Sequence, residues 1–79
     1  MPSTCLYIVI QSLQKWWVDC EGKAYGPFPS QLAANRAGVE LASLYGDLSR
    51  PIEVLSKGDS GLYHLLWSSE AESVFSDAA

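Results

Sequence analysis

Apolar and polar residues alternate along residues 16–21, which predicts a β-strand with two different faces. One side is apolar, and the other carries two acids beside a second tryptophan. The two sets are Trp16, Val18 and Cys20, and Trp17, Asp19 and Glu21. Because successive strand side chains point to opposite faces of a sheet, one indole faces a core and Trp17 faces outward.

Similar patterns along the rest of the chain predict four further strands and one helix. The predicted strands are 5–13, 16–21, 24–28, 52–57 and 62–68, and the predicted helix is 31–45. Ser30 is the expected N-cap, Gly46 the expected left-handed residue after the last turn, and Gly38 a point of close approach between helix and sheet. This order predicts an α+β domain, an antiparallel sheet of four to five strands with one helix packed on one face.

The alternation also predicts which side chains form the core and which face outward. The expected core is Trp16, Val18, Phe28, Ala34, Leu41, Tyr45, Ile52 and Val54, with parts of the first and last strands. The expected helix-free face carries Trp17, Asp19, Glu21, Tyr25, Glu53 and Leu55. Pro27 has no N–H to donate, so the strand that contains it is expected at an edge of the sheet.

The chain has 79 residues, of which 48% are hydrophobic and 18% charged, a composition typical of one globular domain. We expect a domain over residues 1–68 and an acidic flexible tail over 69–79. The apolar stretch 5–10 is too short for a membrane span and has no basic residues before it, so we expect no secretory signal and a cytoplasmic protein. Cys5 and Cys20 allow one disulfide, but nothing else indicates an oxidising compartment, which favours free thiols.

The net charge of −4 weighs against nucleic acid as a partner. Proteins that bind phosphate backbones cluster their basic residues, whereas the five lysines and arginines here are scattered along the chain. An acidic protein of this kind suits a basic surface on another protein.

Three sequence features together resemble a family of small uncharacterised bacterial domains with a β-β-α-β-β layout. They are the W-x-V strand that leads to Gly22, the S-Q-x-x-A-x-x-x-G-x-E-L-A helix over 30–42, and the Gly-rich hairpin over 53–61. The resemblance covers residues 7–66 and implies the fold without implying an activity. Trp17, Asn35 and the acidic charge depart from the pattern of that family.

No group of residues indicates catalysis or a metal site. His64, the only histidine, has no nucleophile or carboxylate near it in sequence, and Cys20 is expected in the core, where a thiol behaves as a small apolar group. Asp19, Glu21 and Glu53 could offer oxygen ligands to a cation, but solvated acids on an outer face are the simpler interpretation. The glycines of 58–61 suit a hairpin turn. We therefore expect no enzyme, cofactor or metal.

The outward aromatic residues indicate a binding surface, because Trp and Tyr are enriched at the energetic centres of interfaces. Trp17 and Tyr25, with Leu55, would form an apolar centre rimmed by Asp19, Glu21 and Glu53. The leading hypothesis is a non-enzymatic interaction module that binds a partner protein, or itself as a homodimer, through the helix-free face or an edge strand. In a second interpretation Trp17 packs against residues 74–75 of the tail. The alternative function is a phage-encoded or defence-related inhibitor whose acidic surface mimics nucleic acid.

Overall fold

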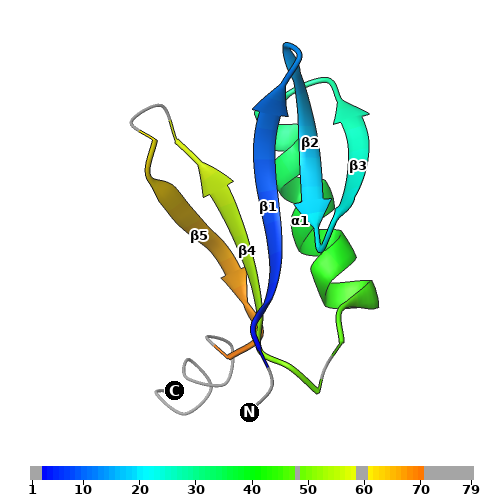
Figure 1. The fold of residues 1–79 in the computed structure, drawn as a ribbon, viewed down its shortest axis with the longest axis vertical. Helices are drawn as coiled ribbons and strands as arrows, with labels where there is room; N and C mark the ends of the chain where they lie inside the picture. The colour runs from blue at the N-terminus through cyan, green and yellow to red at the C-terminus, as the bar shows by residue number, and fades with distance from the viewer. Residues whose placement is uncertain (1–2, 48, 59–60, 71–79) are drawn as a thin grey trace.

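The computed structural model describes residues 3–47, 49–58 and 61–70. Its elements follow in the order β1 (Cys5–Ser12), β2 (Lys15–Cys20), β3 (Lys23–Phe28), α1 (Gln31–Tyr45), β4 (Ile52–Lys57) and β5 (Tyr63–Ser68). The strands form one sheet in the order β3-β2-β1-β4-β5, and α1 lies behind β1 and β2 in Figure 1. The predicted α+β architecture, with one helix packed on a sheet, is confirmed. The predicted tail over 69–79 lies outside the described residues from residue 71 onward.

One pair of neighbouring strands in the sheet is parallel. β1 and β4 run in the same direction, with Tyr7 opposite Val54, whereas the other three pairs are antiparallel. The chain leaves β3 at the edge of the sheet, returns through α1, and enters β4 beside β1, and a parallel pair requires such a crossover. The prediction of a wholly antiparallel sheet is therefore wrong at this pair.

The helix begins as the sequence predicts. The Ser30 hydroxyl accepts a hydrogen bond from the backbone N–H of Ala33 at 3.1 Å. The helix residues that are fully buried are small, namely Ala34, Gly38 and Ala42.

The prediction that Tyr45 lies in the core is wrong, because its side chain is 75% exposed. The buried stripe follows positions four residues apart, which leaves Tyr45 beside edge strand β3 instead of over the sheet.

Gly46 ends the helix for a different reason from the predicted one. Its φ of −66° is an ordinary value, so the predicted left-handed conformation is wrong. Its N–H donates to the carbonyl of Ala42 at 3.0 Å. A Cβ at this position would overlap the Ala42 carbonyl and the Ile52 side chain. Position 46 therefore requires glycine because there is no room for a side chain, and not because of its backbone angle.

The core lies between α1 and the strands at the centre of the sheet. The fully buried residues with the largest side chains are Val9, Val18, Ile52 and Val54. Trp16, Phe28 and Leu41 are partly buried against them. The predicted core is thus confirmed for Val18, Ala34, Ile52 and Val54, and β1 adds Cys5, Tyr7 and Val9.

A buried serine explains the polar residue at position 35. The Ser56 hydroxyl, 3% exposed, donates to Oδ1 of Asn35 at 3.0 Å and accepts from Nε2 of Gln31 at 3.0 Å. A buried hydroxyl without partners is destabilising, so the two amides on α1 compensate for a polar residue on β4. Asn35 therefore joins the helix to the sheet through a hydrogen bond. An aliphatic residue at position 35 would leave the Ser56 hydroxyl without an acceptor for its proton.

Candidate interaction face

The helix-free side of the sheet carries a continuous apolar band, which we call the outer face. Residues directly opposite each other on neighbouring strands share a face of the sheet. The pairs that form the band are Trp17 with Ile10, Ile8 with Leu55, and Leu55 with Leu65. Leu6 precedes Ile8 on the same side of β1. The band therefore crosses four of the five strands.

α1 lies on the other side of the sheet from this band. Gly38 of α1 approaches Val9, Val18 and Val54, whose side chains alternate with those of the outer face. Within the described ranges no helix or strand packs on the outer face (Figure 1). Leu65 is 54% exposed, while Ile8, Ile10, Trp17 and Leu55 are half-buried among their neighbours. The band is thus a side of the sheet that still exposes apolar surface.

Trp17 is held in place by its own polar atom. Its indole Nε1 donates a hydrogen bond to the carbonyl of Ser12 at 3.0 Å, and its backbone lies opposite Ile10. The turn that joins β1 to β2 consists of Leu13 and Gln14, both with positive φ. Because the N–H is satisfied within the hairpin, the ring presents an apolar surface with no polar group that requires a partner.

The charged residues of the outer face lie beside the apolar band. Asp19 and Glu53 lie beside Ile8 and Leu6 respectively. Lys15 and Lys57 lie on the same face, with Lys15 opposite Ser12 and Lys57 opposite Tyr63. Asp19 and Leu55 both flank Ile8, and Lys57 follows Ser56 at the level of Ile10, so charged side chains border the apolar band within the rows that form it.

Glu21 lies in the turn after β2 and not in the strand. Its φ is 47°, and its carboxylate forms an ion pair with Arg50 at 2.7 Å. The hydrogen bond with Glu21 raises the pKa of Arg50. The Arg50 guanidinium also donates to the Ser3 carbonyl at 2.9 Å, so it holds the segment that precedes β1. Glu21 is therefore already paired, and it contributes less negative charge to the rim than the sequence predicts.

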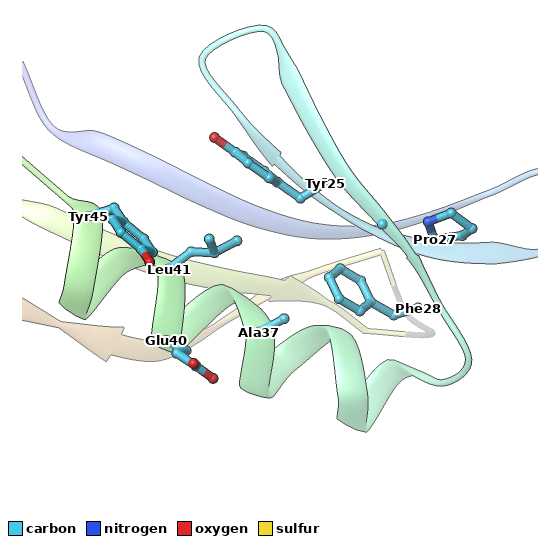
Figure 2. Close-up of a pocket in the computed structure, with 8 residues that line it drawn as sticks. Tyr25, Pro27, Phe28, Ala37, Glu40, Leu41 and Tyr45 are labelled. Atoms are coloured by element: carbon cyan, nitrogen blue, oxygen red, sulfur yellow. The ribbon is translucent and has the colours of Figure 1, made fainter.

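Tyr25 lies on the helix side of the sheet, so placing it beside Trp17 is wrong. It is opposite Val18, a core residue, and the β2–β3 register shifts between Trp16 and Val18. Figure 2 shows Tyr25 on the same side as Leu41 and Tyr45 of α1, with Phe28 farther along β3. Together they line a groove of about 490 Å³ between β3 and α1. The sequence provided no register for β3, so the face of its one tyrosine was not determined.

The residues considered for chemistry are far apart. Cys20 on β2 and His64 on β5 are separated by two strands, or roughly 14 Å across the sheet. Asp19 and Glu53 lie on β2 and β4 with β1 between them. Over 3–47, 49–58 and 61–70, no three His, Cys, Asp or Glu side chains gather as metal ligands would. Cys5 and Cys20 are free thiols.

Two buried ionisable groups on β1, a thiol and a phenol, make the stability of the fold decrease at alkaline pH. Burial raises the pKa of the Cys5 thiol from 9.0 to about 11 and that of the Tyr7 hydroxyl from 10.0 to about 12, and the nearby Cys20 thiol adds to both shifts. Both groups are neutral when protonated, and the folded chain holds these protons more tightly than the unfolded chain does. Stability is therefore full below pH 9 and is lost as pH rises through 11 and 12.

We expect the free energy of unfolding to fall by about 2 kcal/mol or more between pH 9 and pH 12. Denaturant titrations at a series of pH values measure this slope. Tyr7→Phe removes one of the two ionisations and should flatten the slope above pH 10. A slope that is the same in wild type and Tyr7→Phe would show that Tyr7 is ionised as easily in the folded chain as in the unfolded one.

β1 contributes three residues to the outer face that were not among the predicted ones. Leu6, Ile8 and Ile10 occupy the centre of the band. The signal was present, because residues 5–10 are apolar at every position. A strand that is apolar on both sides is typical of the centre of a sheet covered on both faces. This run, together with Trp17, indicates a second apolar face.

Comparison with known protein families finds no match, and searches of the curated proteins and of the solved structures also find none. The resemblance to a family of small bacterial β-β-α-β-β domains therefore stays a prediction. In the part of the chain that the structure describes, no helix has the length and apolar character needed to cross a membrane.

Proposed function

We propose that this protein is a non-enzymatic interaction module whose outer face binds a protein surface. The observation that carries the proposal is the apolar band that crosses four strands on the side of the sheet opposite α1. Apolar surface of this extent, with charges at its edges, is typical of a protein–protein interface. The two free thiols favour the cytoplasm as its setting.

Trp17 is the proposed anchor of this surface. Trp17→Ala should weaken binding by about 2 kcal/mol or more, or about thirtyfold in Kd, because the central aromatic residues of an interface contribute most of its energy. Affinity capture from the cell that makes the protein, with wild type and Trp17→Ala compared by mass spectrometry, measures the loss. The proposal requires that at least one bound protein, including a second copy of the chain, is depleted with Trp17→Ala.

Leu44→Ala is the matched control for this experiment. Leu44 is 64% exposed on α1, so its truncation removes a similarly apolar side chain away from the outer face. Leu65→Ser serves as a second test variant, because Leu65 lies on the outer face and is too exposed to contribute much to the core. If Trp17→Ala and Leu65→Ser retain the same proteins as Leu44→Ala, the outer face is not the binding surface.

The alternative, an acidic mimic of nucleic acid, has less support. Such a mimic needs a row of unpaired acids, whereas Glu21 is paired with Arg50 and the outer face carries Lys15 and Lys57 as well as acids. We therefore do not propose it.

A further inference from the structure

We infer that the groove between β3 and α1 binds a small organic molecule that carries a quaternary ammonium group. The site goes beyond the proposed function, because this groove lies on the helix side of the sheet and Trp17 faces the other side. The inference is carried by the combination of three aromatic rings and one carboxylate in an otherwise apolar hollow of about 490 Å³.

The aromatic rings lie along the whole length of the groove. Figure 2 shows Tyr25 and Tyr45 toward one end, Phe28 toward the other, and Leu41 between them. The two tyrosine side chains are 37% and 75% exposed, so a ligand can reach both rings. The face of an aromatic ring carries partial negative charge and attracts a cation that lies within about 6 Å of its centre. The walls of the groove therefore favour a cation over a neutral molecule of the same shape.

Glu40 supplies the charge of the groove. It is exposed on α1 and lines the groove beside Leu41, and no lysine or arginine of the described residues lines this hollow with it. Arg36, one helical turn earlier, lines a separate hollow that Glu40 also borders. The ion pair found in the described ranges joins Arg50 to Glu21 instead. A carboxylate beside aromatic rings, without a cation of its own chain in the groove, is complementary to a positively charged ligand.

The polar groups of the groove favour a quaternary ammonium over a primary one. A primary ammonium has three N–H donors and is strongly hydrated, so it needs several acceptors in place of water. The side chains of the groove offer one carboxylate and two tyrosine hydroxyls along an apolar lining. A quaternary ammonium has no donor to satisfy and presents methyl groups to the rings.

The size of the groove indicates that the ligand is a whole small molecule and not an ammonium group alone. Pockets for small molecules typically enclose about 300–1,000 Å³. We expect the charged end beside Glu40 and the exposed ring of Tyr45, and an apolar body over Leu41 and Phe28.

A matched pair of ligands tests the preference for positive charge. Choline and its neutral analogue, in which a carbon atom replaces the charged nitrogen, have the same shape. NMR titrations that follow the tyrosine ring resonances measure both affinities. Choline should bind at least about fivefold more tightly than the neutral analogue. Equal affinities overturn the inference, as does the absence of choline binding at about 50 mM.

A second pair of ligands tests the size of the occupant. Benzyltrimethylammonium should bind more tightly than tetramethylammonium, because its ring covers the apolar part of the groove. Equal affinities of these two cations would show that only the ammonium group is recognised, which overturns the proposal of a whole small molecule.

Two variants of the groove and two controls locate the binding site. Glu40→Gln and Tyr45→Leu should each weaken choline binding about fivefold and leave binding of the neutral analogue unchanged. Glu70→Gln and Tyr63→Leu are the matched controls, since both residues are exposed and lie on or beside β5, at the opposite edge of the sheet from β3. Groove variants that bind choline as wild type does, or controls that weaken it equally, overturn the inference. Capture through Trp17 is measured separately, so the proposed function survives such a result.

Discussion

Gly38→Leu is expected to remove a large part of the free energy of unfolding. A Cβ added at Gly38 would lie 3.3 Å from Cγ1 of Val54 and 3.6 Å from side-chain atoms of Val9 and Val18. These three valines form the centre of the core, so the four carbons of a leucine have no space unless α1 moves off the sheet. We expect a loss of more than about 3 kcal/mol, since overpacking and displaced core contacts add.

A domain of this length has roughly 4–12 kcal/mol of stability in total, so this loss removes much of it. Circular dichroism and urea denaturation measure the change. Gly38→Ala is the matched control, because its single methyl group needs only a small shift of Val54 and the helix gains about 1 kcal/mol of propensity. A free energy of unfolding in Gly38→Leu equal to that of wild type would contradict the close approach of α1 to the sheet.

Gly46→Ala is expected to cost about 2–3 kcal/mol although its backbone angles suit alanine. The new methyl group would overlap the Ala42 carbonyl, which accepts the last hydrogen bond of α1, and the Ile52 side chain. Relief of this overlap requires the helix end to move away from β4. Thermal denaturation should show a fall in Tm of about 4–8 °C for each kcal/mol lost.

A double-mutant cycle with Ile52→Val separates the two overlaps. Valine lacks the Cδ1 atom that the added methyl group would meet, so Gly46→Ala should cost less in the Ile52→Val background than in wild type. An equal cost in both backgrounds would show that the overlap with Ile52 contributes nothing. In that case the Ala42 carbonyl alone would account for the destabilisation.

The sequence predicts the elements well because their signals are local. The Ser30 cap, the apolar stripe of α1 and the alternation in β2 each depend on residues within one turn or one strand. They place Trp16 and Trp17 on opposite faces without any knowledge of the sheet. The same alternation correctly assigns Glu53 and Leu55 to the side opposite Ile52 and Val54.

The errors concern features that depend on how distant segments pair. The face of Tyr25 is set by a register shift between β2 and β3, and the direction of β4 by the crossover through α1. The exposure of Tyr45 depends on where the sheet ends, and the role of Gly46 depends on a side chain of β4. Local patterns carry none of this information. The observed outer face therefore contains Trp17, as predicted, but it contains residues of β1 where Tyr25 was predicted.

The central claim is that the outer face contacts another protein molecule in the cell. Its most direct test is a photo-reactive amino acid at position 65 of the full chain, irradiated in the cell, with position 44 on α1 as the control. Covalent adducts are expected from position 65, to a second copy or to another protein, and few are expected from position 44. No adducts from position 65, or equal adducts from both positions, would contradict it.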